Sequence, residues 1–210
     1  MEPFFAGLAP TTVMEMADLS RRMYTLREER KLWLTDIGFE DSDELLAAIA
    51  DGKVAEHPAY EIWLASQLSG EQLETLRVQL DWRCRNPVGE TQNTESAHPM
   101  DAIALTLDLP DNFEQEFSLP ADGLGLRSAD GVDVLLRVVS SQHWSVEWQH
   151  GERRWRLDTA PVAHAGVDTH AHLHRPDGSV VADPLALSKD LEPAAIVQHI
   201  VDALGRSFDW

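Results

Sequence analysis

Residues 132–158 read VDVLLRVVSSQHWSVEWQHGERRWRLD, and bulky apolar side chains recur at every second position in three successive segments of this stretch. A period of two is typical of strands in an antiparallel sheet, because successive side chains of a strand point to opposite faces. Asp130–Gly131 precedes the first segment and His150–Gly151 separates the last two, and both dipeptides suit tight turns. The sequence therefore predicts a β-meander.

Further elements are expected on both sides of this meander. Residues 103–109, IALTLDL, alternate in the same way and predict another strand. The turn residues PDG at 176–178 lead into Val180 and Val181. Pro193 suits the first turn of a helix, and the apolar stripe of residues 196–204, IVQHIVDAL, can cover one face of the sheet.

The N-terminal part has the spacing of helices instead. From Thr12 to Trp33 apolar side chains recur at steps of three and four residues, which predicts a helix with Thr11 or Thr12 as its cap. Further helices are expected to begin at Asp41, at Pro58 and at Ser69. Gly52 suits the end of the second helix.

These patterns predict an α+β protein. Residues 1–85 are expected to form a helical domain of about four helices, and residues 101–210 an antiparallel β domain with a C-terminal helix. Residues 86–100 contain Pro, Asn, Thr and Glu but few bulky apolar side chains, so we expect them to form a linker.

Composition limits the kinds of partner. The 210 residues contain 17 Lys and Arg against 36 Asp and Glu, a net charge of −19, which disfavours general DNA binding and anionic membranes. The same acidity is also typical of proteins from salt-adapted organisms. A single cysteine, Cys84, excludes an internal disulfide, and no apolar run is long enough for a signal peptide or a membrane span. We therefore expect a cytoplasmic protein.

Histidines cluster in residues 167–174, VDTHAHLH. On a strand, His170, His172 and His174 would lie on one face, and alternating imidazoles of this kind can bind Zn²⁺ or another transition metal. A further ligand is expected from a neighbouring strand or loop, and the candidates are His164, Asp168, Asp158 and His143. Alternatively, the histidines lie on a solvated face and bind carboxylates or phosphates.

Residues 130–204 resemble the small TumE-type toxins of prokaryotic toxin–antitoxin pairs. Those proteins carry an Arg-aromatic-Asp-Asn-Ala-Pro-like segment followed by a histidine cluster. The matching positions here are Arg154, Trp155, Asp158, Ala160, Pro161, His164, His170, His172 and His174. Leu157 is an insertion relative to that pattern, and Thr159 stands where the family often has Asn. The resemblance implies a defence-associated protein that acts on RNA or a nucleotide.

Chemistry of this kind needs a cation beside the phosphate and groups that transfer protons. Arg154 and Arg156 can neutralise a phosphate, while His170 and His172 serve as general acid and base beside Asp158, without a metal ion. His164, His170, His172 and His174 are the metal ligands in the alternative case.

A second class of function is also consistent with the sequence. The protein can be a non-enzymatic binding or regulatory module, similar in role to an antitoxin, whose helical half binds another protein. The net charge of −19 favours this alternative, because an acidic surface can mask a basic partner or mimic nucleic acid.

Overall fold

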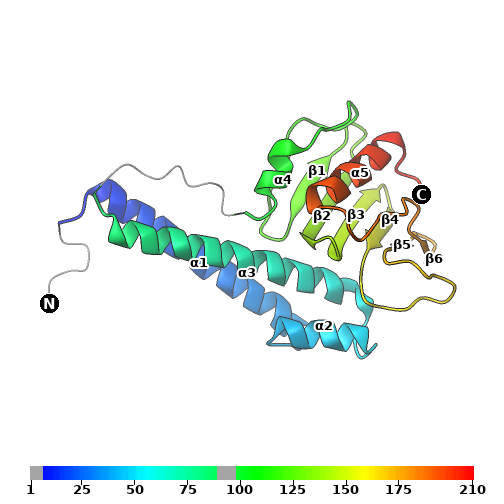
Figure 1. Ribbon diagram of the computed structural model, residues 1–210, viewed down its shortest axis with the longest axis horizontal. Helices are drawn as coiled ribbons and strands as arrows, with labels where there is room; N and C mark the ends of the chain where they lie inside the picture. The colour runs from blue at the N-terminus through cyan, green and yellow to red at the C-terminus, as the bar shows by residue number, and fades with distance from the viewer. Residues whose placement is uncertain (1–6, 89–97) are drawn as a thin grey trace.

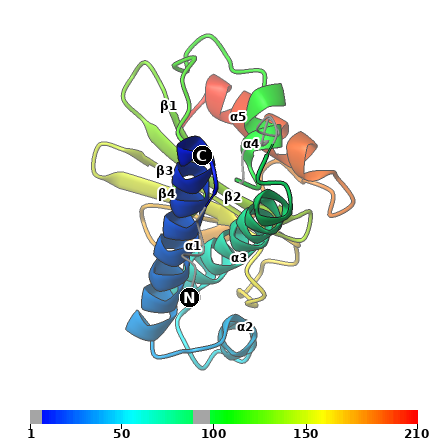
Figure 2. The ribbon, with the colours of Figure 1, turned by 90° about the vertical axis from the view of Figure 1, so that its left-hand side faces the viewer.

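The computed structural model describes residues 7–88 and 98–210 and confirms the α+β class. The N-terminal helices are α1 (Pro10–Asp36), α2 (Ser42–Ala50) and α3 (Glu56–Arg85), and the later helices are α4 (Asp101–Thr106) and α5 (Pro193–Arg206). Helices α1 and α3 pack along each other and extend well beyond the sheet (Figures 1 and 2). None of these helices combines the length and the apolar character needed to cross a membrane.

The sheet has six antiparallel strands in the order of the chain. They are β1 (Leu124–Arg127), β2 (Asp133–Ser140), β3 (His143–His150), β4 (Arg153–Asp158), β5 (His172–His174) and β6 (Val180–Ala182). Strands β2, β3 and β4 are the predicted meander. Each strand pairs with its sequence neighbours. Short turns join most of these pairs, whereas residues 159–171 form a longer connection between β4 and β5.

One face of the sheet is apolar and packs against α5 (Figure 1). Trp148 and Trp155 lie opposite each other on β3 and β4, with parallel rings whose centres are 5.9 Å apart. The Trp148 Nε1–H also donates to the Phe208 carbonyl at 2.8 Å, just beyond α5. The predicted apolar stripe of α5 is buried: Ile196, Val197, Ile200, Val201 and Leu204.

The expected strand over residues 103–109 is wrong, because residues 101–106 form α4. Met100 and Ala104 are buried, and Ile103 and Leu107 pack beside them. These positions are spaced i, i+3, i+4 and i+7, the spacing of one helix face. Leu105, which the alternation placed on one face with Ile103 and Leu107, is 71% exposed.

The expected helix starts at Thr11 or Thr12 and at Ser69 are also wrong. Helix α1 begins at Pro10, and the Thr12 hydroxyl donates to the Pro87 carbonyl at 3.2 Å. Helix α3 continues through Ser69, which is fully buried, so residues 7–85 form three helices and not about four. The side chain of Gln72 donates to the Ala121 carbonyl at 2.9 Å and not to a helix start.

The N-terminal helices and the sheet share a second core cluster. Tyr60, Trp63 and Leu64 of α3 pack with Ala160, which follows β4, and with Val139 of β2. The Tyr60 hydroxyl is hydrogen-bonded to the Thr159 hydroxyl at 3.0 Å.

Most of the expected linker at 86–100 lies outside the described residues. Its last residue, Met100, is fully buried in the core of the β part.

We predict that Trp148→Ala lowers the free energy of unfolding by about 3–5 kcal/mol, because a large ring that is fully buried leaves a cavity when it is removed. Leu105→Ala, at an exposed position, should change it by less than about 0.5 kcal/mol. Urea unfolding followed by far-ultraviolet circular dichroism measures the free energy of unfolding of both variants. Similar losses in the two variants would contradict the assigned core.

Candidate metal centre

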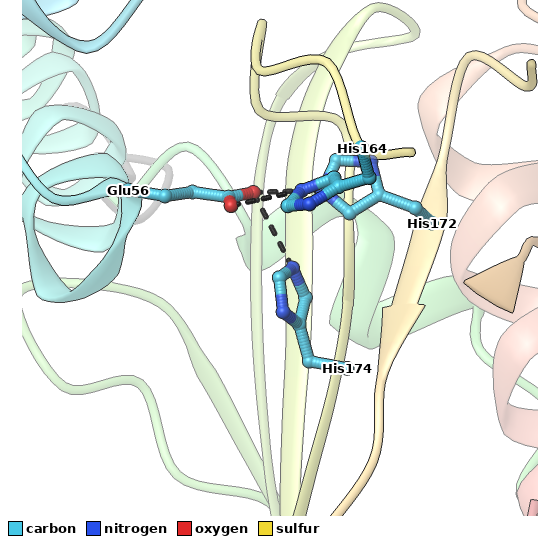
Figure 3. Close-up of side chains that lie close together, drawn as sticks. All are labelled: Glu56, His164, His172 and His174. Carbon is cyan, nitrogen blue, oxygen red and sulfur yellow. Dashed lines mark hydrogen bonds and ion pairs between the residues drawn. The ribbon is translucent and has the colours of Figure 1, made fainter. Parts of the chain in front are cut away.

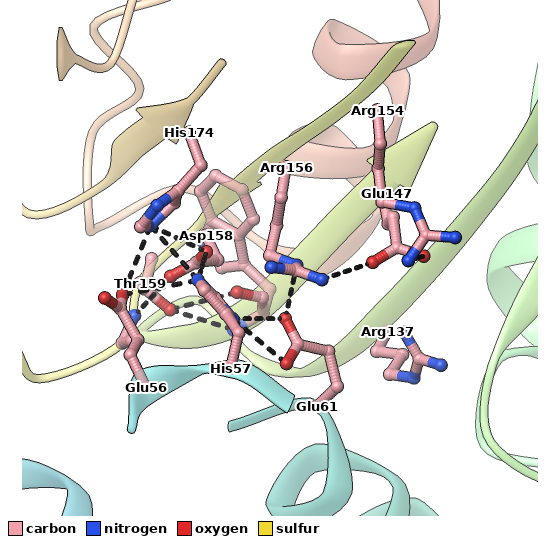
Figure 4. A network of polar contacts seen from close by, with 12 residues as sticks. Glu56, His57, Glu61, Arg137, Glu147, Arg154, Arg156, Asp158, Thr159 and His174 are labelled. Carbon is pink, nitrogen blue, oxygen red and sulfur yellow. Dashed lines mark hydrogen bonds and ion pairs between the residues drawn. The ribbon is translucent and has the colours of Figure 1, made fainter. Parts of the chain in front are cut away.

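Six ionisable side chains converge where α3 begins beside β4 and β5, on the face of the sheet opposite α5 (Figures 3 and 4). They come from four places in the chain: the first residues of α3, the end of β4, the loop after β4, and β5. They are Glu56, His57, Asp158, His164, His172 and His174.

Glu56 lies at the centre of this group. Its Oε1 is 2.7 Å from His172 Nε2 and 3.3 Å from His174 Nε2, and its Oε2 is 3.0 Å from His164 Nε2 (Figure 3). One ligand atom from each of these four residues lies within 4.8 Å of the others. Such an arrangement can hold a metal ion.

Strand pairing positions the two histidines of β5. Leu173 is fully buried in the apolar core, so His172 and His174, one residue to either side, point to the opposite face. His164 is brought back to the same place by a turn in which the Val167 N–H donates to the His164 carbonyl at 3.1 Å. Gly166 in this turn has a φ of 77°, which favours glycine.

His57 enters the centre from the first turn of α3, where its φ and ψ are −115° and 137° and not helical. Its Nε2 is 3.1 Å from His174 Nε2 and 3.5 Å from Asp158 Oδ2 (Figure 4). The other nitrogen, Nδ1, is 2.8 Å and 3.0 Å from the two carboxylate oxygens of Glu61. Glu61 therefore fixes the orientation of the His57 ring.

Arg156 holds Glu61 in turn. Its Nε is 2.7 Å from Glu61 Oε1 and its Nη2 is 2.5 Å from Glu147 Oε2 (Figure 4). Burial raises the pKa of Glu61, but the hydrogen bond and charge of His57 and the charge of Arg156 outweigh burial and lower that pKa. Arg156 thus supports the centre through Glu61.

Burial and hydrogen bonds act differently on the two central carboxyl groups. Burial raises the pKa of Glu56, but hydrogen bonds from His172 and His174 outweigh burial, so the pKa lies well below its usual range. Complete burial raises the pKa of Asp158 well above its usual range, and the charges of Glu56 and Glu61 act in the same direction. Burial lowers the pKa of His164, which favours the neutral imidazole that metals bind.

The structure brings together most of the residues expected from sequence. His164, His172, His174 and Asp158 lie in the centre. The predicted strand is shorter than expected, however, and His170 lies in the bend before it, exposed and outside the converging ligand atoms. Its charge acts on His143 instead, whose pKa is lowered by burial first and by His170 second.

The two arginines proposed for catalysis differ in environment. Arg156 is 15% exposed and paired with Glu61, whereas Arg154 is 59% exposed and donates to Gln149 Oε1 at 3.2 Å. Asp168 is exposed.

Glu56, His57 and Glu61 were not foreseen, because they belong to the helical part, which was treated as separate from the histidines. The four-residue spacing of His57 and Glu61 is a signal in the sequence, since residues i and i+4 meet on a helix. It does not indicate that β5 lies opposite, more than 100 residues later.

Comparisons with family models, with curated proteins and with solved structures gave no match for this chain. The resemblance to TumE-type toxins stays a prediction, and a function has to be argued from the centre itself.

We predict that Arg156→Ala lowers the free energy of unfolding by about 3 kcal/mol, because it leaves the buried Glu61 carboxylate without its cation. Arg154→Ala removes an exposed arginine from the same face of β4 and should cost less than about 0.5 kcal/mol. Chemical denaturation of the two variants measures this difference. Equal stabilities would show that Arg156 does not support the centre.

Proposed function

We propose that this protein binds a divalent transition metal through Glu56, His164, His172 and His174, and uses it to hydrolyse a phosphate ester, with RNA as the substrate class. The observation that carries the metal site is the convergence of three imidazole nitrogens on one partly buried carboxylate. Among the described residues, one further group of four possible ligands is found, and it overlaps this one at Glu56 and His174.

The donor set indicates which ions fit. Imidazole suits Zn²⁺ and its transition-metal neighbours, whereas Mg²⁺ and Ca²⁺ prefer oxygen ligands throughout. Three nitrogens and one carboxylate oxygen are a donor set that Zn²⁺ accepts with four-coordinate geometry. Zn²⁺ is therefore the ion to test first.

Partial exposure supports a reactive rather than a purely structural ion. The side chains of His164 and His174 are each 19% exposed, so solvent reaches one side of the centre. With four protein ligands, a zinc ion here would take water as a fifth ligand, because zinc can expand to five-coordinate geometry. The ion would lower the pKa of that water to about 7 and so provide a nucleophile for an ester.

A pocket of about 420 Å³ borders Glu61 and Arg156, the two residues that support the centre, and it suits a phosphate-bearing substrate. None of the six converging side chains lines it. Glu61 lines this pocket and contacts both His57 and Arg156. Arg137 and Arg154 line it as well, and Nε and Nη1 of Arg137 are buried without a hydrogen-bond partner among the described residues. Guanidinium groups of this kind bind phosphate oxygens. Each arginine also faces a carboxylate, so the pocket is not strongly basic.

The proposal of a toxin-like or defence-associated role is supported by the resemblance of residues 130–204 to TumE-type toxins together with this pocket. The alternative, a binding module with a protein partner, is supported by the part of α1 and α3 that extends beyond the sheet (Figure 1). Apolar side chains there are exposed: Met14, Tyr24, Leu32 and Val78.

We predict that His172→Ala weakens Zn²⁺ binding by about 100-fold or more, because it removes a ligand atom at the centre. His170→Ala is the matched control, because His170 is exposed and lies outside the converging ligand atoms, and it should keep the wild-type affinity. Competition with a zinc-binding dye measures both. Absence of zinc binding in the wild type, or equal losses in the two variants, would contradict the proposal.

A second prediction concerns activity on RNA. Cleavage of single-stranded RNA by the wild-type protein should stop when a chelator removes the metal and return when Zn²⁺ is added, because the ion supplies the nucleophile. Acid–base catalysis by histidines alone would leave the rate unchanged after chelation. The His172→Ala protein serves as the background control. A metal-bound wild type that cleaves no RNA would favour the non-enzymatic binding module.

A further inference from the structure

We propose that the centre holds two metal ions, with Glu56 as a carboxylate bridge between them. In this arrangement the first ion is bound by Glu56, His164 and His172, and the second by Glu56, His57, Asp158 and His174. The inference rests on the proposed metal site and adds to it a second ion, together with two ligands, His57 and Asp158, that the first ion does not use.

Ligand geometry is the first argument. One atom each from Glu56, His57, Asp158 and His174 lies within 4.8 Å of the others, in a second group that overlaps the first. His57 Nε2 is 3.1 Å from His174 Nε2 and 3.5 Å from Asp158 Oδ2. Two nitrogens on one tetrahedral zinc ion are separated by about 3.3 Å when each Zn–N bond is about 2.0–2.1 Å. The observed separations fit one ion between these three groups.

Asp158 provides an independent argument. Its side chain is fully buried, and Oδ1 accepts a hydrogen bond from the Ala160 N–H at 2.9 Å. Oδ2 accepts none from the described residues, although it faces His57 Nε2 and His174 Nε2 at 3.5 Å and 3.7 Å. A buried carboxylate oxygen without a partner is costly. A cation between Oδ2 and the two imidazoles satisfies it.

The orientation of His57 supports the same ion. Both oxygens of Glu61 lie close to Nδ1, so Nδ1 is placed to donate to Glu61 and Nε2 is the nitrogen directed at the centre. Carboxylates hydrogen-bonded to the outer nitrogen are common behind metal-bound histidines. Arg156 in turn holds Glu61, with its Nε 2.7 Å from Glu61 Oε1.

The two oxygens of Glu56 allow a bridge. Oε2 lies 3.0 Å from His164 Nε2, whereas Oε1 lies 2.7 Å from His172 Nε2 and 3.3 Å and 3.6 Å from the Nε2 atoms of His174 and His57. Oε1 thus faces ligands of both ions, and Oε2 faces a ligand of the first ion alone. Since one imidazole nitrogen binds one ion, His174 belongs to a single ion, and six donor residues exceed what one four-coordinate ion takes. Pairs of ions about 3.5–4 Å apart stabilise both the attacking and the leaving oxygen in phosphoester hydrolysis.

The test is the number of zinc ions per chain. Full-length protein is dialysed against a low excess of Zn²⁺. The bound zinc is then measured by inductively coupled plasma mass spectrometry. We expect two ions in the wild type and one in His57→Gln and in Asp158→Asn. His164→Gln removes a ligand of the first ion only, so this variant should lose the first ion, keep the second and also retain one ion. Its double variant with His57→Gln should retain none.

Co²⁺-loaded wild-type protein should in addition show magnetic coupling between two ions, which His57→Gln abolishes. Asp158→Asn changes a buried group, so thermal melting establishes whether that variant folds; His57 is 17% exposed, and its variant decides the question if Asp158→Asn does not fold.

The outcomes separate the two proposals. One ion in the wild type, unaffected by His57→Gln, overturns the second ion and leaves the proposed function intact; Asp158 is then protonated and shares its proton with a histidine. Two ions that both survive His57→Gln and Asp158→Asn also overturn it. No bound ion in the wild type overturns the proposed function as well.

Discussion

The pairing of β4 with β5 is the constraint on which the centre depends. Its register places Asp158 opposite His172 and Arg156 opposite His174, with Leu157 opposite Leu173 on the other face. The two leucines are fully buried against the apolar core. A shift of one residue would exchange the faces and move the histidines into the core. Hydrophobic packing on the side of α5 therefore fixes the polar groups on the side of α3.

Helix α3 completes the centre and joins the two parts of the chain. Its first turn carries Glu56 and His57, and its second turn carries Glu61, so one short segment provides a central carboxylate, an imidazole and the group that orients that imidazole. Tyr60 lies between them and binds Thr159, directly after Asp158. The helical part is thus attached to the sheet at the residues that supply the ligands.

Much of the fold could be predicted from local sequence patterns, because the meander and α5 bury one face of regular elements. Residues 103–109 show where this fails: alternation over a short stretch also satisfies a helix whose Met100 and Ala104 are buried. Ser69 shows the same limit, since its pattern is that of a helix cap and its hydroxyl is used by tertiary contacts. Tertiary packing decides between such alternatives.

Only part of the candidate site could be predicted, for a different reason. His164, His172, His174 and Asp158 lie within 17 residues of one another, so a local histidine pattern revealed them, and strand alternation placed two of them on one face. Glu56 and His57 come from more than 100 residues earlier, and their role depends on how α3 packs on the sheet. Alternation also included His170, which the short strand leaves out.

The proposed metal ions offer a way for a protein with a net charge of −19 to bind a phosphate ester. Arg156 neutralises Glu61, which leaves the Glu56 carboxylate, whose pKa is lowered, facing imidazoles without a permanent positive charge. A centre in that state repels phosphate. Divalent ions bound as we propose would reverse the local sign, and in a partly buried site their field would be screened less than that of surface carboxylates. Overall acidity would then limit the binding of phosphate away from the centre, while the proposed ions would attract it at the centre.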